Sequence, residues 1–234
     1  MLNTYSPIPK APHTHLEMTL DIWQFSLKTS CLPHELQILS EDEHIRWKRF
    51  YFERHQRRFS VARVRLRQIL AKYLEEDPAK LNFHYESHGK PYLSSSLQFN
   101  LSHSEDVALL AICLKYPVGI DIEFYSARPF LGIGRHLFSE EENQALSYLP
   151  NALKPLCFFH LWAQKEAVIK AVGTGLSYPT PSITVPTLPP TSQHTLETLD
   201  GQSWKVDAFS PVINARAAVC YHPSISTIRY GRYE

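Results

Sequence analysis

A pattern of strand and capped helix occurs twice in this sequence, and the second copy lies about a hundred residues after the first. LDIWQF at Leu20–Phe25 matches IDIEF at Ile120–Phe124, and each segment alternates as a strand does, with an aspartate at the same place. LSEDEH at Leu39–His44 then matches FSEEEN at Phe138–Asn143. In both, a serine followed three positions later by a glutamate indicates a helix capping box. The chain is therefore expected to fold as a duplicated α+β unit.

A long helical pattern follows each capping box, and strand-like segments close each half. Helices are predicted over residues 57–77, before Pro78, and over residues 157–172, with Gly173 just past the end. FNLSHSEDVALLAICL in the first half and SWKVDAF and ARAAVCYH in the second indicate strands, and the proline-rich segment Thr184–Thr195 indicates a surface loop. We predict two similar α/β subdomains in a pseudo-twofold arrangement, with a ligand site at their interface. Their ranges are residues 1–117, with a loose lead-in at 1–18, and residues 118–234.

Composition and charge narrow the possible partners. The 234 residues carry 24 Lys and Arg against 23 Asp and Glu, a net charge of +1, so neither nucleic acid nor a membrane surface is expected as a partner. No apolar run of about 18 residues is present, and the polar N-terminal stretch lacks the apolar segment of a secretory signal. Four widely separated cysteines are typical of reduced thiols. We expect a cytoplasmic protein.

Two acidic residues interrupt the otherwise apolar strand VGIDIE at residues 118–123. Asp121 and Glu123 lie two positions apart in this strand, so their side chains point the same way. Two carboxylates that close repel each other unless one is protonated or a cation lies between them. A divalent cation such as Mg²⁺, which prefers oxygen ligands, would suit the pair. A solvated strand edge is the alternative.

Trp162, Glu166 and Lys170 are spaced four positions apart and share one stripe of the second predicted helix. A Glu–Lys pair at this spacing is often only a surface ion pair. Here, however, the pair lies among Ala, Val and Ile in AQKEAVIKAVG, and Lys165 adds a second cation beside Glu166. The set indicates a third carboxylate for a metal and lysines for phosphate oxygens. A salt-bridged surface helix is the alternative.

The first half supplies a histidine and basic side chains that suit an anionic ligand. FNLSHS places Ser102 and His103 next to an apolar strand, where neighbouring side chains point apart, so a nucleophile–base pair is not expected. The turn HGKPY is expected to present Lys90 outward. RWKRFYFERHQRR, between Arg46 and Arg58, crowds basic residues on helical surface, either as a solvated face or as a clamp for an anion.

Taken together, GKP, FNLSHS, VGIDIE and LWAQKEAVIKAVGTGLS, in that order and spacing, resemble the Sfp-type 4′-phosphopantetheinyl transferases. The resemblance runs from about Glu41 to Ser177, and its most specific elements are GIDIE and W-x-x-K-E-x-x-x-K with the trailing GLS. It implies the 4′-phosphopantetheinyl transferase fold, with the active site between the halves. It also implies a monomer, because the half-length branch of the family assembles as trimers whereas this chain holds both halves.

The resemblance also implies a reaction and roles for individual residues. Coenzyme A binds between the halves, the serine hydroxyl of an apo acyl or peptidyl carrier protein attacks the β-phosphate, and adenosine 3′,5′-bisphosphate leaves. By motif position, Asp121, Glu123 and Glu166 would hold Mg²⁺ (or Mn²⁺), and Lys170 would stabilise charge on the transferring phosphoryl group. Either Glu166 or a water on the metal would take the serine proton. Contacts to the coenzyme are expected from Arg46, Arg58, Lys90, Ser102, His103 and Lys165.

Three glutamates depart from, or add to, the family pattern. Glu105 stands after HS, where the family often has glycine, and Glu43 stands where a phosphate-binding lysine can occur. Glu142 matches a glutamate that recurs near the family's site, although the capping box already accounts for it. Of the roles that the resemblance implies, the clamp for the 3′-phosphate therefore transfers least well to this chain.

The segment FYSARPFLGIGR, residues 124–135, is expected to be a loop that docks the carrier protein. Phe130, Leu131 and Ile133 would supply apolar contact area, while Arg128 and Arg135 would attract the acidic recognition helix of the carrier.

Two other classes of function compete with this interpretation. A metal-dependent nuclease also uses acids and a lysine, but it carries Glu and Lys two apart on a strand, whereas Glu166 and Lys170 are four apart on a predicted helix. A nuclease of this size would also carry more positive charge. The second rival is a binding module that keeps the fold without turnover, and the presence of every expected catalytic side chain argues against it.

Overall fold

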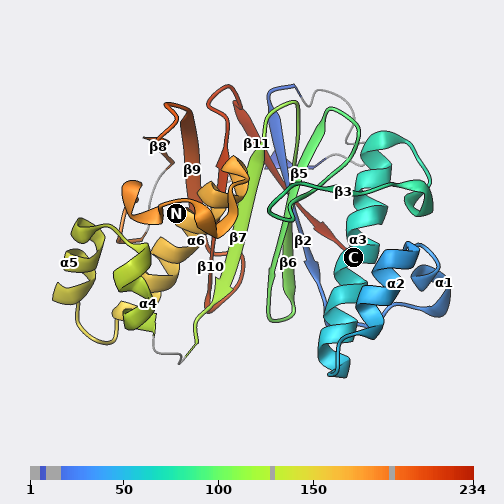
Figure 1. The fold of residues 1–234 in the computed structure, drawn as a ribbon, viewed down its shortest axis with the longest axis horizontal. Helices are drawn as coiled ribbons and strands as arrows, with labels where there is room; N and C mark the ends of the chain where they lie inside the picture. The colour runs from blue at the N-terminus through green and yellow to red at the C-terminus, as the bar shows by residue number, and fades with distance from the viewer. Residues whose placement is uncertain (1–5, 9–16, 127–129, 190–192) are drawn as a thin grey trace.

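A computed structural model describes residues 6–8, 17–126, 130–189 and 193–234 of the chain. Two β-sheets pack face to face at the centre of the molecule, and each is covered on its outer face by helices (Figure 1). The order of layers is helix, sheet, sheet, helix, so the predicted α+β class with two sheet-containing subdomains is confirmed.

The first sheet has five strands in the order β1-β11-β2-β6-β5. Antiparallel pairing joins β2 (Thr19–Ser26), β6 (Val107–Leu114) and β5 (Leu97–Ser104). Parallel pairing adds β11 (Thr227–Tyr233) and β1 (Ser6–Pro7) on the other side of β2. A small hairpin of β3 (His84–Tyr85) and β4 (Pro91–Tyr92) stands beside this sheet.

The second sheet is antiparallel throughout, in the order β7-β10-β9-β8. Its strands are β7 (Val118–Phe124), β10 (Ala215–Tyr221), β9 (Ser203–Phe209) and β8 (His194–Glu197). β7, the strand with the two acids, is thus an edge strand, and it runs alongside β5, the edge strand of the first sheet. The two strands meet where the sheets adjoin.

Helices α1 (Pro33–Leu36), α2 (Glu41–Lys48) and α3 (Glu53–Leu74) belong to the first half. Helices α4 (Phe130–Leu137), α5 (Glu140–Tyr148) and α6 (Lys154–Val172) belong to the second half. α6 ends as predicted, because Gly173 caps it with a φ of 83°, a left-handed conformation that glycine adopts without strain. α3 begins and ends slightly earlier than predicted, and Glu75 caps it in the same conformation. Short 3₁₀ turns occupy Pro78–Lys80, Gly175–Ser177 and Thr180–Ser182.

Three apolar layers hold the four structural layers together. α3 packs on the outer face of the first sheet, and α6 packs on the outer face of the second. Between the sheets, Leu20, Ile22 and Leu109 on one side meet Ile120 and Val219 on the other. The alternation of VGIDIE therefore places its apolar side chains in the layer between the sheets, as the sequence predicts, and leaves Asp121 and Glu123 on the face toward α6.

The internal repeat extends to a buried, ion-paired glutamate in each half. Glu43 at the start of α2 accepts a hydrogen bond from Ser40 N–H and is ion-paired with Arg63 and Arg67 of α3. Glu142 at the start of α5 accepts from Ser139 N–H and is ion-paired with Lys165 of α6, 2.7 Å away. In the second half Ser139 Oγ also accepts from Glu142 N–H, which completes the capping box. Each half thus fixes a short capped helix onto its long helix through a buried glutamate.

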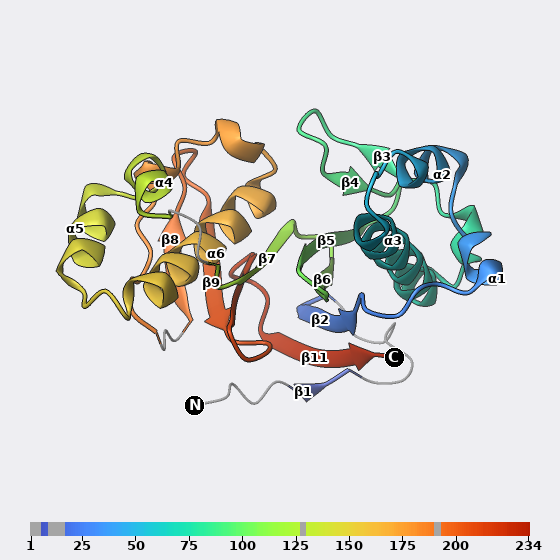
Figure 2. The ribbon, with the colours of Figure 1, turned by 90° about the horizontal axis from the view of Figure 1, so that it is seen from below.

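The last strand does not belong to the half in which the sequence places it. β11 lies between β1 and β2 in the first sheet (Figure 2), where Arg229 donates two hydrogen bonds to the buried carboxylate of Asp21. The predicted second subdomain, residues 118–234, therefore differs from the structure at its C-terminal end, because β11 belongs to the sheet of the first half. The sequence TIRYGRY gives no sign of which sheet it joins.

Two further predictions fall on these elements. The segment 124–135 is not wholly a loop, because α4 begins at Phe130; Arg128 lies outside the described residues.

All four cysteines are free thiols, and Cys113, Cys157 and Cys220 are buried. Within the described ranges, no helix combines the length and the apolar character that a membrane crossing requires.

Candidate active site between the two sheets

Alternate side chains of β5 form a ladder of hydrogen bonds onto β7. Asn100 Oδ1 accepts from Ile120 N–H at 2.8 Å. Two positions on, Ser102 Oγ donates to Asp121 Oδ1 at 2.9 Å. Ser104 Oγ, two further, donates to Glu123 Oε2 at 3.1 Å. The edge strands of the two sheets are thus joined through side chains, and this ladder fixes the orientation of both acids.

Gly119 allows helix α6 to approach the strand that carries the acids. A Cβ atom at this position would overlap the backbone of α6 at Ala167 O and Ala171 N. Only glycine is compatible with this close contact between β7 and α6. Because the helix lies so close, Glu166 and Lys170 stand next to Asp121.

Asp121 and Lys170 form the central charge pair of the site. Lys170 Nζ lies 2.5 Å from Asp121 Oδ1, and it also donates to Ser102 Oγ at 3.2 Å. Burial alone would lower the pKa of Lys170, but the negative charges of Asp121, Glu166 and Glu123 outweigh it and raise the pKa. Lys170 is therefore a permanent cation of the site, and its side chain remains 27% exposed.

The other two acids are harder to ionise than free carboxyl groups. Burial and then the charge of Asp121 raise the pKa of Glu123, whose Oε1 accepts a hydrogen bond from Trp162 Nε1 at 3.3 Å. Burial raises the pKa of Glu166 to about 7; the charge of Lys170 opposes this shift, and the charges of Asp121 and Glu123 add to it. Asp121 and Glu166 are therefore close enough to sense each other's charge.

The donor set suits a hard divalent cation. Asp121 Oδ2 is buried, and no polar atom of the described residues hydrogen-bonds to it. A buried carboxylate oxygen of this kind needs a partner, and repulsion among three acids is relieved by positive charge between them. Mg²⁺ is bound in proteins through one or two carboxylates together with substrate phosphates and water.

The predicted set of three metal ligands is nevertheless not assembled in this structure. In the part of the chain that is described, no group of three His, Cys, Asp or Glu side chains is arranged to hold a metal. Glu123 and Glu166 line two different cavities, and Lys170 already binds Oδ1 of Asp121. The assignment of Asp121, Glu123 and Glu166 as joint ligands stays a prediction.

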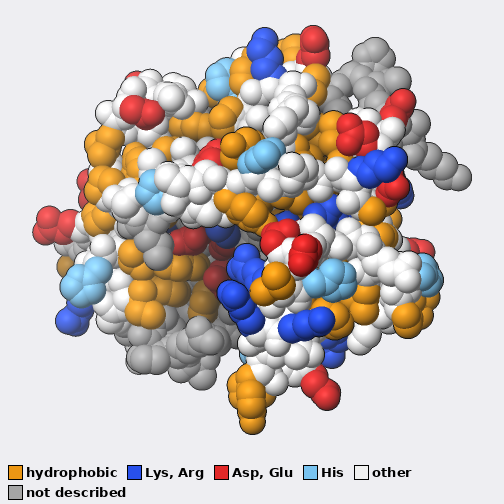
Figure 3. Space-filling view, turned by 45° about the vertical axis from the view of Figure 1, so that its right-hand side comes forward, with side chains coloured by type: hydrophobic (Ala, Val, Ile, Leu, Met, Phe, Trp, Pro, Cys, Tyr) orange, Lys and Arg blue, Asp and Glu red, His pale blue; other side chains and the backbone are white. Residues whose placement is uncertain are grey.

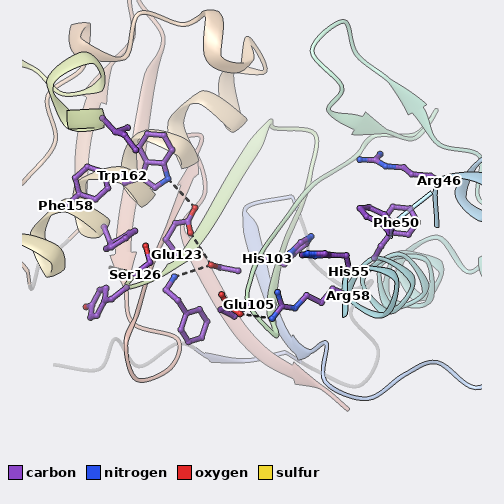
Figure 4. A pocket seen from close by; sticks show the side chains of 16 residues that line it. Arg46, Phe50, His55, Arg58, His103, Glu105, Glu123, Ser126, Phe158 and Trp162 are labelled. Atoms are coloured by element: carbon purple, nitrogen blue, oxygen red, sulfur yellow. Dashed lines mark hydrogen bonds and ion pairs between the residues drawn. The ribbon is translucent and has the colours of Figure 1, made fainter. Parts of the chain in front are cut away.

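A large cavity opens on one side of this charge pair. Its volume is about 730 Å³, and the space-filling view shows a hollow with hydrophobic side chains on one wall and basic side chains on the opposite one (Figure 3). The basic wall carries Arg46 and Arg58, with His103 at the floor; the apolar wall carries Phe158 and Trp162 (Figure 4). Desolvation of His103 in this cavity lowers its pKa, and the positive charges of Lys170 and Arg58 lower it further.

A smaller cavity of about 270 Å³ continues along the same elements. β5 contributes Asn100 and Leu101 to this cavity and His103 and Ser104 to the large one. α6 likewise contributes Glu166 and Lys170 here and Phe158 and Trp162 there. The two cavities therefore follow one another along one groove between β5 and α6, with Ser102, Asp121 and Lys170 at the junction.

Three of the predicted coenzyme contacts are occupied inside the protein. The side chain of Lys165 is 1% exposed; it pairs with Glu142 and donates to the carbonyls of Thr180 and Ile183. The prediction that Lys165 holds a ligand is therefore wrong, because all three of its protons are used. The carbonyls of Val118 and Lys170 accept hydrogen bonds from Lys90, so its ammonium is not directed outward as predicted, although the residue lines the small cavity.

Ser102 is the third of these residues. It is buried, and its hydroxyl is bonded to Asp121 and Lys170 instead of facing a ligand. By contrast, Arg46, Arg58 and His103 all line the large cavity. Of the six predicted coenzyme contacts, these three line the large cavity, although Arg58 is ion-paired there with Glu105 and Asp106.

Several contacts of the site were not predicted. Asn100 and Ser104 hold β7 in place, Trp162 hydrogen-bonds Glu123, and Glu105 is ion-paired with Arg58. The strand alternation of FNLSHS carries the signal for the first two, because residues 100, 102 and 104 share one face. The role of Glu105 depends on the conformation of a turn, which the sequence does not reveal.

Two family models match the chain. The model described as the 4′-phosphopantetheinyl transferase superfamily matches residues 117–220, and that described as 4′-phosphopantetheinyl transferase, N-terminal, matches residues 23–115. The matched ranges meet between residues 115 and 117, where the chain passes from the first sheet to the second.

Curated relatives with the same description align over most of the chain. The 4′-phosphopantetheinyl transferase HetI of Nostoc sp. is 39% identical over 179 residues, which cover 73% of this chain and 76% of HetI. The 4′-phosphopantetheinyl transferase Sfp of Bacillus subtilis is 30% identical over 153 residues, 64% of this chain and 67% of Sfp. A putative 4′-phosphopantetheinyl transferase of Synechocystis sp. is 31% identical and covers 67% of this chain and 65% of its own length.

Proposed function

The chain belongs to the 4′-phosphopantetheinyl transferase superfamily, and on this premise we propose that it transfers the 4′-phosphopantetheine arm of coenzyme A to a serine of an apo acyl or peptidyl carrier protein. The observation that carries the proposal is the Ser102–Asp121–Lys170 cluster at the junction of two cavities in one groove. A long, polyanionic coenzyme matches a groove with basic side chains along one wall and, at its centre, a lysine beside carboxylates that suit a cation.

Charge neutralisation is the main demand of this reaction. Phosphoryl transfer depends on positioning and on stabilising negative charge more than on covalent help from the protein. Lys170 supplies a fixed positive charge for the phosphoryl group, and the buried Asp121 keeps that lysine ionised. Asp121, Glu123 and Glu166 would hold Mg²⁺, whose chemistry when bound is to neutralise the pyrophosphate.

The reaction forms one bond and breaks another. The serine oxygen of the carrier forms a bond to the β-phosphorus of coenzyme A, and the anhydride bond to the α-phosphate oxygen breaks. Adenosine 3′,5′-bisphosphate leaves with the electron pair of that bond, and the serine proton passes to a base. Glu166 suits this role, because its side chain lines the groove beside Lys170 and a carboxylate next to Mg²⁺ stays ionised at neutral pH.

The coenzyme is expected to lie against the basic wall of the large cavity. Arg46 and Arg58 reach the nucleotide, and His103 donates to a phosphate from the floor. Lys90, in the small cavity, supports the site by binding the backbone of β7 and α6 at Val118 and Lys170. These contacts belong to the proposal and are tested one residue at a time by the affinity for coenzyme A.

The carrier protein is proposed to dock on residues 124–135, of which Phe124, Tyr125, Ser126 and Ile133 line the large cavity. Ile133 is exposed and lines this cavity, and Arg135 is exposed on the same helix. An acidic recognition helix would be attracted by the arginine and would bury the isoleucine. We also propose a cytoplasmic monomer, since four free thiols suit a reducing compartment and both halves of the site lie in one chain.

One assay tests the proposed function. The protein is incubated with Mg²⁺, coenzyme A and a panel of apo carrier proteins, and the carrier is analysed by mass for the added pantetheine arm on serine. We expect the addition with at least one carrier, its loss when the metal is chelated, and its loss in Asp121→Asn. Absence of the addition with every carrier would overturn the proposal, and cleavage of DNA under the same conditions would favour the nuclease.

A further inference from the structure

Glu105 projects into the large cavity from the turn that joins β5 to β6. Its Oε2 atom lies 2.7 Å from Arg58 Nη2, and its side chain is 64% exposed (Figure 4). Arg58 itself is 18% exposed and lines the same cavity, next to Arg46 and His103. A carboxylate of the protein is thus bound to a cation that the cavity presents to an anionic ligand.

The two acids bound to Arg58 differ in what else they do. Asp106 accepts from Arg58 Nε at 2.9 Å and also from Arg57 Nη2, while its backbone carbonyl accepts from Leu27 N–H. Asp106 therefore fixes the turn and the base of the guanidinium. Glu105 makes a single ion pair at the tip of Arg58, so its carboxylate can leave without disturbing the turn.

The backbone at Glu105 is unusual for a residue with a side chain. Its φ is 48°, in the left-handed region that glycine adopts freely and other residues adopt at a cost. Such conformations persist where the surrounding structure imposes them, and they concentrate at functional sites. This conformation directs the carboxylate into the cavity, toward Arg58.

We infer that Glu105 competes with a phosphate of the coenzyme for Arg58 and thereby lowers the affinity of the enzyme for coenzyme A. The inference rests on the proposed function. A phosphate that approaches Arg58 must displace the Glu105 carboxylate, because both are anions and both need the same guanidinium edge. The same competition favours the departure of the adenosine bisphosphate product, so Glu105 sets how strongly the nucleotide is held.

Direct binding of coenzyme A, measured by calorimetry, tests the inference. Exposed ion pairs contribute little, so we expect Glu105→Gln to lower the Kd for coenzyme A by about two- to fivefold. Glu105→Gly should do the same, because it also removes the carboxylate. An unchanged or higher Kd in Glu105→Gln overturns the inference, and so does a lower Kd in the glycine variant alone, which would assign the effect to backbone strain.

Two matched variants separate the local contact from a general change of charge. Glu75→Gln removes the same charge at another left-handed position, at the end of α3 and outside the cavity, and should leave the Kd unchanged. In the background Arg58→Met, Glu105→Gln should give no gain, because the two effects are coupled through one ion pair. A gain of equal size in either case contradicts the inference.

The steady-state reaction distinguishes this inference from the proposed function. We expect Glu105→Gln to lower the KM for coenzyme A while the KM for the carrier protein stays constant. If the wild-type protein transfers the pantetheine arm but Glu105→Gln does not change the KM for coenzyme A, only the inferred competition is contradicted. Failure of the wild-type protein to transfer the arm would remove the proposed function itself.

Discussion

The ammonium nitrogen of Lys170 lies 2.5 Å from Oδ1 of Asp121, and the two residues come from different layers, the end of helix α6 and the edge strand β7. The pair links the helix to the strand at the point where the two cavities meet. Because Asp121 is buried, it stabilises the charge of Lys170, and Lys170 in turn offsets part of the negative charge of three acids. One contact therefore serves both the fold and the proposed chemistry.

Substitution of Lys170 should reduce turnover far more than stability. Lys170→Met removes the positive charge aimed at the phosphoryl group, and we expect kcat to fall by about 10²–10³, as for other single electrostatic contacts to a transition state. Lys170→Arg keeps the charge and should retain more activity. Single-turnover rates measure both variants, and near wild-type rates in Lys170→Met would contradict the role assigned to this lysine.

Gly119 should not tolerate even a methyl group. In Gly119→Ala the added Cβ overlaps the backbone of α6 at Ala167 and Ala171, so the helix must move away from β7. We expect a loss of about 1–3 kcal/mol or more in the free energy of unfolding, together with loss of activity because Lys170 moves from Asp121. Urea unfolding measures the first effect and the transfer assay the second.

Gly132 provides the control for this substitution. It lies in α4, and nothing stands within 4 Å of an added Cβ. Gly132→Ala should therefore stabilise the protein slightly, by about 0.5–1 kcal/mol, through helix propensity. If both substitutions destabilise the protein by a comparable amount, close packing of β7 on α6 is not the cause of the effect of Gly119→Ala.

The buried pair Glu142–Lys165 should matter for folding and not for the coenzyme. Lys165→Met leaves Glu142 as a buried charge without its partner, and loss of one member of such a pair costs about 3–5 kcal/mol. The double variant Glu142→Gln/Lys165→Met removes both charges and should recover much of this stability. Thermal and urea unfolding of the single and double variants measure these effects.

The same double variant tests the corrected role of Lys165. Because its three protons bind Glu142 and two backbone carbonyls, removal of its charge in a folded protein should leave the Kd for coenzyme A unchanged. A clearly weakened Kd in the double variant, with native stability, would mean that Lys165 reaches the coenzyme after all.

Much of the fold follows from local patterns in the sequence. The alternation in VGIDIE, the serine–glutamate caps at Ser40 and Ser139 and the glycine after α6 all predict what the structure shows, because each depends on neighbours within four residues. The pairing of β11 with β2 depends on residues about two hundred positions apart. No local pattern determines such a contact, so the division of the chain at residue 117 could not foresee it.

In the site, too, local spacing in the sequence predicts some features, while tertiary contacts determine the others. Spacing on a strand and on a helix indicated which side chains share a face, and the structure brings Lys170 onto Asp121, while joint binding of a metal by Asp121, Glu123 and Glu166 stays a prediction. Which cations face a ligand was not predictable. Lys165 and Lys170 are five residues apart on one helix, yet Lys165 points to Glu142 of α5 and Lys170 to Asp121 of β7. The difference lies in the packing of α5 on α6, a tertiary contact.

Charge reversal on the proposed docking segment should affect the carrier protein alone. Arg128→Glu/Arg135→Glu replaces attraction of an acidic carrier helix by repulsion, so we expect a higher KM for the carrier, more so at low salt. The KM for coenzyme A should stay constant, since the coenzyme is assigned to the opposite, basic wall of the cavity. Lys48→Glu/Arg49→Glu, in exposed residues of α2 and its end, is the matched change of charge. An unchanged carrier KM in the first variant would remove the docking role.

Acid should destabilise the protein through His160, which is buried in α6. Burial lowers its pKa from 6.5 to about 4, helped by Arg216 and His194. Between these two values the unfolded chain holds a proton on this histidine and the folded chain does not, so lowering the pH favours unfolding. His160 therefore has no effect on the unfolding free energy above about pH 6.5, and below that value it lowers this free energy by about 1.4 kcal/mol per pH unit until about pH 4.

His160→Gln should flatten the dependence of unfolding free energy on pH in this window, measured by urea titration, whereas the same substitution at exposed His136 should leave it unchanged. An equal slope in wild type and His160→Gln would mean that other groups cause the acid sensitivity.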